Sequence, residues 1–317
     1  MKVTVVGAGH VGATCAQYIL QHELADVHLV DIAEGLAAGK ALDLAEAMPI
    51  LGKSLRVTGS QDYAGAADSD LVVITAGRPR KPGMSRDDLL EINGRIVASI
   101  AAELRQVTPQ ALVIVVSNPL DVTAYIVHRV MDLPPERCMG MAGILDTARF
   151  RAFVAMELGC SAADVQALVL GGHGDSMVPI LSSATVGGIP LTDLLPAERL
   201  DAIVQRTRQG GAEIVGLLKT SSAFYAPGAA VAQMVAAIAR DEKRLLPASV
   251  KPQGEYELED VFVGLPVILG AAGVEQIVQM SLTDDELQAL HRSAEAVRSA
   301  RDRWHELAGD DPSAWVS

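Results

Sequence analysis

The first 143 residues alternate between short apolar runs and helical segments, and this alternation constrains the fold more than any other feature of the sequence. The apolar runs are continuous and rich in β-branched residues, as is typical of strands buried on both faces of a parallel sheet. The pattern predicts an α/β chain with a doubly wound parallel sheet and helices on both of its faces. The expected strands are 3–7, 27–31, 70–77 and 111–118, and the expected helices are His10–Gln21, Ala33–Met48, Asp88–Gln106 and Asp121–Met131.

After residue 143 the rhythm changes to a mixture of helices and strands. A helix is expected to end at Gly159, a natural C-cap, and a strand to follow at 164–172. The last long helix should begin at Thr283, because Glu286 three residues later completes a capping box. A chain of 317 residues is longer than most single domains. We therefore expect two closely packed domains, residues 1–143 and residues 144–317.

Composition excludes several classes of protein. The net charge of −13 and the pI near 4.9 oppose a nucleic-acid partner, which requires a broad basic surface. No apolar run reaches the roughly 18 residues of a membrane span, and the N-terminus does not read as a secretory signal. Cys15, Cys138 and Cys160 lie far apart, so we expect buried thiols in a reducing cytoplasm, with neither a disulfide framework nor a metal site.

Residues 7–12, GAGHVG, satisfy the pattern G-x-G-x-x-G between an expected strand and an expected helix. In that context the first glycine permits a tight turn, the second lets a pyrophosphate approach the backbone, and the third lets the helix pack closely. The free N–H groups and the helix dipole would then face the anion. The alternative is that the glycines only turn the chain. The expected cofactor-binding residues are Gly7, Ala8, Gly9, His10, Val11 and Gly12.

Asp31 ends the second expected strand, 19 residues after Gly12. A carboxylate at this position can accept hydrogen bonds from the ribose of a dinucleotide, and it would repel a 2′-phosphate. Asp31 therefore favours NAD over NADP. The alternative is that Asp31 caps the helix expected to begin near Ala33.

His173 lies among glycines directly after an expected strand, in GGHGDSMVP, and histidine is the side chain best suited to exchange a proton near neutral pH. Asp146 and Arg149 lie three residues apart on one helical face, in LDTAR. If that face meets His173, Asp146 can orient the imidazole, and the Arg149 guanidinium suits a carboxylate. The alternatives are a histidine with a structural role and an exposed ion pair.

The segment ITAGRPRKPGMSRDDL, residues 74–89, gathers four cations in an acidic chain. Two prolines and a glycine between them predict a loop. A solvated surface loop is the simple interpretation, while an anionic ligand would give the cations a function. The four residues are Arg78, Arg80, Lys81 and Arg86.

Seven motifs in this order resemble NAD-dependent malate dehydrogenases of the bacterial type that is similar to lactate dehydrogenase. They are GAGHVGAT, VDI, AGRPRKPGMSRDDL, VSNPLD, GILDTARFR, GGHGDSMVP and TSSAFYAPGAA, and the resemblance covers essentially the whole chain. The resemblance implies a Rossmann NAD-binding domain followed by a mixed α+β substrate domain. It also implies NAD as cofactor, malate or oxaloacetate as the small dicarboxylate substrate, and a homodimer or homotetramer.

The resemblance also implies roles for individual residues. His173 would accept the substrate proton, Asp146 would orient the His173 ring, and Arg149 would bind the C1 carboxylate. Arg86 would polarise the C2 oxygen, and Arg80 would bind the second carboxylate. The remaining implied contacts are Asn118 with substrate and cofactor, Asn93 and the backbone at Val116 with NAD, and Ser222 with the substrate.

Two alternative functions differ in what they require of these residues. A lactate dehydrogenase would share the machinery but would leave the Arg80 guanidinium without a second carboxylate. A silent NAD-binding redox sensor would keep the glycine motif and Asp31, but it need not keep His173, Asp146 and the arginines together. A dianionic substrate also explains the cationic loop, since it supplies local attraction despite the negative net charge.

Overall fold

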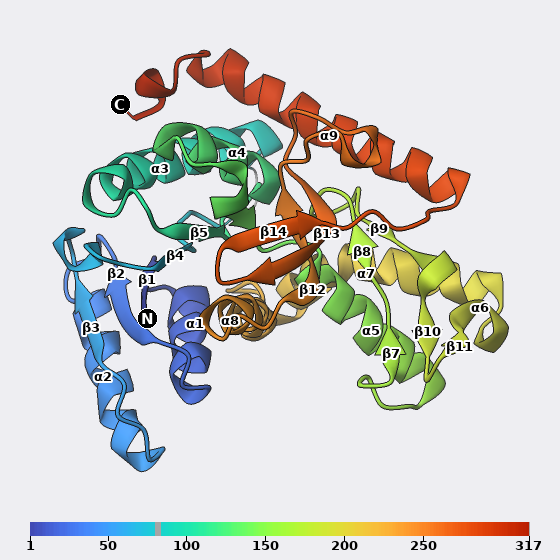
Figure 1. The fold of residues 1–317 in the computed structure, drawn as a ribbon, viewed down its shortest axis with the longest axis horizontal. Helices are drawn as coiled ribbons and strands as arrows, with labels where there is room; N and C mark the ends of the chain where they lie inside the picture. The colour runs from blue at the N-terminus through green and yellow to red at the C-terminus, as the bar shows by residue number, and fades with distance from the viewer. Residues whose placement is uncertain (80–83, 317) are drawn as a thin grey trace.

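One sheet at the centre of the molecule receives strands from both halves of the chain (Figure 1). The structure, a computed structural model, describes residues 1–79 and 84–316. The parallel strands are β1 (Lys2–Val6), β2 (Asp26–Val30), β3 (Val57–Ser60), β4 (Leu71–Ile74), β5 (Leu112–Val115) and β6 (Cys138–Gly140). They lie side by side in the order β3-β2-β1-β4-β5-β6. This is the order of a Rossmann sheet, so the predicted fold class is confirmed.

The burial of the strands explains why the apolar runs predicted them. Every residue of β4 and β5 is buried, because helices cover both faces of the central strands. Strands β3 and β6 were not predicted. The sequence VTGS of β3 holds only one aliphatic side chain, and β6 is only three residues long, so neither forms a recognisable apolar run.

Helices lie on both faces of the sheet (Figure 1). One face carries α1 (His10–Gln21), α2 (Leu36–Ile50) and α8 (Tyr225–Ala239), and the other carries α3 (Arg86–Val107), α4 (Leu120–Met131) and α9 (Asp284–Ala308). Helix α1 has the predicted bounds, and α3 begins two residues early because Ser85 and Asp88 form a capping box. None of the helices in the described ranges is long and apolar enough to cross a membrane.

The second half of the chain completes the sheet. Strands β12 (Arg244–Val250), β13 (Val263–Gly270) and β14 (Gly273–Ile277) extend it in antiparallel fashion beyond β6. The junction is a single bridge between Ser249 and Gly140. Helix α8 packs closely on α1, where a Cβ at Gly228 would lie 2.6 Å from the Thr14 side chain. Strands from both sides of the predicted domain boundary after residue 143 therefore belong to one sheet. The boundary stays a prediction.

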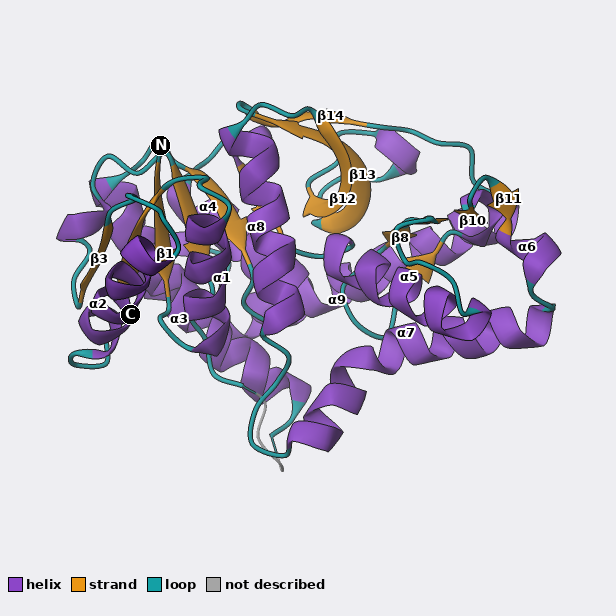
Figure 2. Cartoon of the chain, turned by 90° about the horizontal axis from the view of Figure 1, so that it is seen from below, coloured by secondary structure: helices purple, strands orange, loops and turns teal. Residues whose placement is uncertain are grey.

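A smaller lobe lies beside the sheet and has its own apolar core (Figure 2). The predicted strand 164–172 is wrong as a single strand, because it divides into two short strands that belong to different sheets. Val165 packs in the core of the lobe, whereas Leu170 packs in the core of the main sheet, so the chain must turn between them. The lobe contains α5 (Ile144–Leu158), β7 (Val165–Gln166), β8 (Val169–Leu170), β9 (Val178–Pro179), β10 (Thr185–Val186), β11 (Ile189–Pro190), α6 (Leu191–Leu194) and α7 (Ala197–Leu218).

Helix α9 runs from the small lobe across the face formed by α3 and α4 (Figure 1). It begins at Asp284, directly after its N-cap Thr283, which forms the predicted capping box with Glu286. Near its other end Trp304 is fully buried over Gly94 of α3, where any Cβ would overlap the indole ring. A glycine inside a helix costs about 0.5–1 kcal/mol, whereas burying an indole contributes roughly 4–6 kcal/mol. The packing of Trp304 therefore outweighs the weak helix propensity of Gly94.

His128 on α4 makes the stability of the fold depend on pH. The residue is 8% exposed, its ring lies 5.4 Å from the Phe262 ring, and neither ring nitrogen has a hydrogen-bond partner within the described residues. Burial, with the charges of Lys251 and Arg129, lowers its pKa to about 4. Between that pH and about 6.5 the unfolded chain binds the extra proton, so the free energy of unfolding rises with pH through this window.

We predict that His128→Leu reduces this pH dependence. Between pH 4 and 6.5 the free energy of unfolding should rise less steeply with pH in the variant, by up to about 1.4 kcal/mol per pH unit. The reason is that one proton-binding site has been removed. Denaturant titrations across that range measure it. At pH 8, where the native and the unfolded state both hold the ring neutral, the same comparison isolates the effect on packing. Equal slopes in both proteins would contradict the prediction.

Candidate active site

The loop between β1 and α1 has the geometry that binds a pyrophosphate. Gly7 has a φ of +100°, and a Cβ there would lie 2.6 Å from the backbone nitrogen of Ala76. A Cβ at Gly12 would overlap the carbonyl oxygen of Gly7. A Cβ at Gly9 would meet no atom of the described residues within 4 Å. The first and third glycines are thus required by packing, while the second leaves the backbone open to a ligand.

The amino end of α1 is free to interact with an anion. Gly9 is the N-cap, no side chain caps the helix, and its first turn holds no acidic residue. The helix dipole and the uncapped N–H groups therefore favour a negative charge at this point. Ala8 is fully buried and Val11 packs on the core, whereas the His10 ring is exposed and lies 5.1 Å from the Phe224 ring. The residues present fit a dinucleotide.

Asp31 follows β2 at the same edge of the sheet. Its Oδ2 accepts a hydrogen bond of 2.7 Å from the backbone N–H of Ala8, and its Oδ1 accepts one of 2.9 Å from Ala33. Asp31 thus holds the glycine loop and also the turn before α2. The alternative interpretation, that Asp31 caps this helix, is wrong, because α2 begins at Leu36 after Gly35 and has no side-chain cap. Each carboxylate oxygen can accept a second hydrogen bond, so the group can still bind a ribose diol.

His173 and Asp146, 27 residues apart in the sequence, meet in the structure. His173 follows β8, and Asp146 lies in the first turn of α5. Nδ1 of the ring lies 2.9 Å from Oδ2 of the carboxylate. Asp146 is only 1% exposed, while the His173 side chain retains 16% exposure. The carboxylate therefore fixes one ring nitrogen and leaves Nε2 available for chemistry.

The surroundings shift the pKa values of this pair in opposite directions. For His173, burial alone would lower the pKa, but the charge and hydrogen bond of Asp146, with a further contribution from Asp121, raise it. For Asp146, burial would raise the pKa, but the charge and hydrogen bond of His173 and the charge of Arg149 lower it. A charged carboxylate beside a basic imidazole is the arrangement needed to stabilise an imidazolium during proton transfer.

Arg149 lies beside the pair and keeps unused hydrogen-bonding capacity. Its Nη1 lies 3.2 Å from Oδ1 of Asp146, and the side chain is 13% exposed. Its Nε is buried and has no partner among the described residues. The side chain crosses two glycines of α7, and a Cβ at Gly210 would lie 3.1 Å from the Arg149 Cδ, while one at Gly211 would lie 3.6 Å from Nη2. A substrate carboxylate is the partner that such a guanidinium suits.

One of the predicted loop arginines contacts the segment that follows His173. Arg86 begins α3, and its Nη2 lies 2.7 Å from Oδ2 of Asp175, two residues after His173. Both side chains are 80% exposed, so the pair contributes little to stability and can be exchanged for a ligand. Arg80 lies outside the described residues, so its predicted contact with the substrate stays a prediction.

The remaining predicted residues differ in their surroundings. Asn118 follows β5 and is exposed, and Val116 is buried, its N–H bonded to the carbonyl of Ile74. Asn93 is buried, and its amide bonds the backbone of Arg78 in both directions and donates to the carbonyl of Asn118 over 2.6 Å. Its contact with NAD therefore stays a prediction. Ser222 is exposed between α7 and α8, and no hydrogen bond among the described residues joins it to His173.

The sequence did not identify two side chains that hold this edge together. The hydroxyl of Thr75 donates to the carbonyl of Gly7 over 2.9 Å, which ties β4 to the glycine loop. Asp121 accepts the backbone N–H of His173 over 2.8 Å. Asp121 could have been considered from its place in VSNPLD, three residues after Asn118 at the end of a predicted strand.

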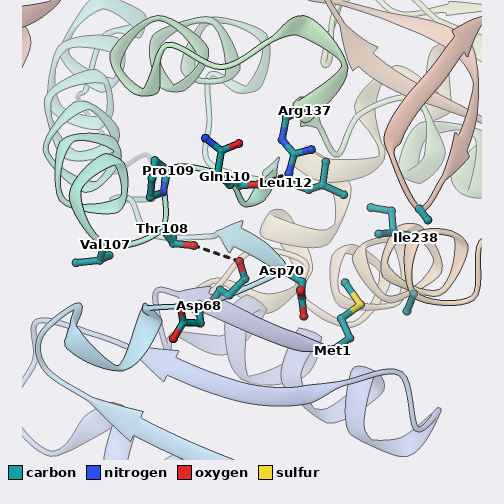
Figure 3. Close-up of a pocket in the computed structure, with 13 residues that line it drawn as sticks. Met1, Asp68, Asp70, Val107, Thr108, Pro109, Gln110, Leu112, Arg137 and Ile238 are labelled. Atoms are coloured by element: carbon teal, nitrogen blue, oxygen red, sulfur yellow. Dashed lines mark hydrogen bonds between the residues drawn. The ribbon is translucent and has the colours of Figure 1, made fainter.

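A cavity of about 690 Å³ lies at the opposite edge of the sheet (Figure 3). Its lining includes Met1, Asp70, Leu112 and Arg137, which precede or begin parallel strands and so mark their amino ends. None of the candidate site residues that the structure describes lines it. Ligands of parallel α/β sheets bind at the carboxyl ends of the strands, so we assign the chemistry to the edge that carries the glycine loop and His173.

Both halves of the chain match known protein families. Residues 1–140 match the lactate/malate dehydrogenase NAD binding domain, and residues 144–307 match the lactate/malate dehydrogenase alpha/beta C-terminal domain. The chain belongs to the lactate/malate dehydrogenase family. The resemblance seen in the sequence is therefore confirmed, and the open glycine loop is part of an NAD-binding domain.

Individual members of this family resemble the chain over almost its whole length. Malate dehydrogenase of Rhodopirellula baltica is 55% identical over 300 residues, which cover 94% of this chain and 95% of that protein. The structure of malate dehydrogenase from Salinibacter ruber has a TM-score of 0.92 and 48% identity, covering 97% and 98% of the two chains. Lactate dehydrogenase from Cryptosporidium parvum, solved with lactic acid and NAD, has a TM-score of 0.93 and 40% identity, covering 96% and 97%.

We predict that Gly210→Ala weakens substrate binding to this dehydrogenase. The added methyl would push the Arg149 side chain by a few tenths of an ångström, which should raise the KM for a 2-oxo acid by about three- to tenfold. Steady-state kinetics of the purified enzyme measure the change. Gly216→Ala on the same helix is the matched control, because a Cβ there would meet no atom within 4 Å in the part of the chain that the structure describes. If both variants keep the original KM, the glycines do not position Arg149.

Proposed function

We propose that this chain catalyses the reversible, NAD-dependent oxidation of (S)-malate to oxaloacetate. The observation that carries the proposal is the buried Asp146 carboxylate, which is hydrogen-bonded to both the His173 ring and the Arg149 guanidinium. The names of its relatives support malate as the substrate, since proteins called malate dehydrogenase are 50–56% identical to it over nearly the whole chain.

The residues of the site divide the chemistry among them. Arg149 binds the C1 carboxylate of malate through the face of its guanidinium that Asp146 leaves free. His173 accepts the proton of the C2 hydroxyl at Nε2, and Asp146 stabilises the imidazolium that results. In the reverse direction the imidazolium returns this proton to the C2 oxygen of oxaloacetate. NAD, held by residues 7–12 and Asp31, supplies the acceptor for the C2 hydride.

Two arginines would complete substrate recognition. Arg86 would exchange Asp175 for the C2 oxygen of the substrate, which its exposed ion pair allows. Arg80 would bind the second carboxylate, the group that separates malate from lactate. Asn118 would contact substrate and cofactor from the end of β5, and Ser222 would complete the site.

The proposed enzyme is a homodimer or homotetramer. The resemblance to malate dehydrogenases implies such an assembly, and a partner subunit would cover some of the large apolar side chains that the single chain leaves exposed. They include Leu42 and Ile50 on α2, Leu217 on α7 and Tyr225 on α8, each more than 60% exposed. Light scattering combined with size-exclusion chromatography would determine the number of subunits.

We place the enzyme in the cytoplasm. All three cysteines are free thiols, and Cys15 and Cys138 are buried, as predicted, whereas Cys160 is half-buried. Burial raises the pKa of the Cys15 thiol to about 12, which keeps it protonated and unreactive. Free thiols suit a reducing compartment.

We predict that the purified protein oxidises NADH when oxaloacetate is added and that it uses NADPH poorly. In a panel of 2-oxo acids, oxaloacetate should give the highest kcat/KM. His173→Asn and Asp146→Asn should each lower kcat by about 10²–10⁴-fold, because proton transfer is lost or misdirected. NADH binding without turnover of any 2-oxo acid would instead indicate a redox sensor.

We predict that Arg80→Gln weakens the use of oxaloacetate more than the use of pyruvate. A charge-assisted hydrogen bond contributes about 1.5–3 kcal/mol, so the preference should fall by roughly 10- to 100-fold. The ratio of kcat/KM for the two substrates measures this, and pyruvate serves as the internal control. A wild-type preference for pyruvate, or equal losses on both substrates, would favour a lactate dehydrogenase.

A further inference from the structure

The three residues that end in His173 are held by three separate parts of the molecule. The N–H of Gly171 donates to the carbonyl of Gly264 on β13 over 2.9 Å. The next N–H, of Gly172, donates to Ser293 Oγ on α9 over 2.8 Å. The N–H of His173 itself donates to Asp121 Oδ2 on α4 over 2.8 Å. Of the three acceptors, only Asp121 is an ionisable side chain.

Both oxygens of the buried Asp121 carboxylate accept hydrogen bonds from the protein itself. It is 5% exposed, and its second oxygen accepts the hydroxyl of the fully buried Ser249 over 2.7 Å. Ser249 lies on β12 and forms the bridge that joins this strand to β6. Asp121 therefore links the loop of His173 to the junction between the parallel and antiparallel parts of the sheet.

The loop is shaped to bring its backbone close to Asp121. Gly171 has a φ of +83°, a conformation that favours glycine. A Cβ at Gly172 would lie 2.7 Å from Val297 and 3.4 Å from Oδ2 of Asp121. Because Gly171 and Gly172 have no side chains, the backbone N–H of His173 can come within hydrogen-bonding distance of the Asp121 carboxylate.

We propose that Asp121 is a positioning residue for the reaction, which fixes the backbone of His173 from α4 and whose charge supports the imidazolium that forms there. This inference rests on the proposed function of His173 in proton transfer and extends it to a second buried carboxylate. Asp146 orients the ring, and Asp121 orients the backbone that carries the ring.

The charges around His173 allow the two carboxylates to be separated experimentally. In the described part of the chain, the ring interacts with Asp146 and Arg149 on α5 and with Asp121 on α4. Asp146 and Asp121 both raise the pKa of His173, and Arg149 lowers it. Burial raises the pKa of Asp121 itself, although the hydrogen bonds that it accepts from Ser249 and His173 oppose this shift. A substitution that removes the charge and keeps the hydrogen bonds therefore isolates the electrostatic contribution.

Asp121→Asn is that substitution, because its amide oxygen can accept the N–H of His173 while its NH₂ group donates to Ser249. We expect the His173 ring to titrate about 0.5–1 pH unit lower in this variant. NMR titration of the histidine ring protons in the whole enzyme, assigned with His173→Asn, measures the shift without requiring turnover. The pH limbs of kcat/KM should move down by the same amount for oxaloacetate reduction and for malate oxidation.

Ser293→Ala is the matched control, since it removes the hydrogen bond to the neighbouring N–H and removes no charge. It should leave the titration of His173 in place. Asp121→Ala, which loses both the charge and the hydrogen bond, should lower the plateau of kcat/KM further than Asp121→Asn does. If Asp121→Asn stays folded and its His173 titrates as in the original protein, the charge of Asp121 does not support the imidazolium. If the NMR shift occurs but no 2-oxo acid is turned over, the proposed function fails and the coupling between Asp121 and His173 stands.

Discussion

The arrangement of the site depends on one buried carboxylate. Asp146 is almost inaccessible to water, so its charge must be compensated by the groups that surround it. His173 and Arg149 provide this compensation, at 2.9 and 3.2 Å. Removing one partner of a buried charge costs about 3–5 kcal/mol, so the fold that pairs Asp146 is strongly preferred over arrangements that separate it from His173. The requirement for pairing thereby fixes the start of α5 against the loop after β8.

The order of the strands brings that pair to the cofactor loop. The chain leaves β6 at the carboxyl edge of the sheet and enters α5 within four residues, so the first turn of α5 lies at this edge. The glycine loop leaves β1 at the same edge, and its Gly7 packs against Ala76 beyond β4. A strand order that reverses between β1 and β4 opens this edge to ligands. Binding and proton transfer are therefore adjacent because of topology, not because of proximity in the sequence.

Much of this arrangement could be predicted from the sequence, wherever the signal is local. Apolar runs located four of the six parallel strands, and the bounds of α1 and the capping box before α9 were correct because caps and periodicity act within a few residues. The contact of His173 with Asp146 was inferred only from the chemistry of the two side chains and from the family resemblance. Local sequence patterns cannot predict a contact between residues 27 apart. Asp121 was missed for the same reason: its partners, His173 and Ser249, lie 52 and 128 residues away. The division of 164–172 into two strands was missed because it depends on which core each side chain enters.

The late strands and α9 have a consequence for how the protein is made. The ribosome releases β1 to β6 first, and these strands form the parallel part of the sheet. Yet the far edge of β6 and the outer surface of α3 and α4 are covered by β12, α9 and Trp304, all of which come after residue 240. From the synthesis of β6 until that of β12 and α9, the nascent amino-terminal half therefore has an unpaired strand edge and an uncovered apolar face. These surfaces are covered only when about the last quarter of the chain emerges, so until then the nascent chain is exposed to self-association.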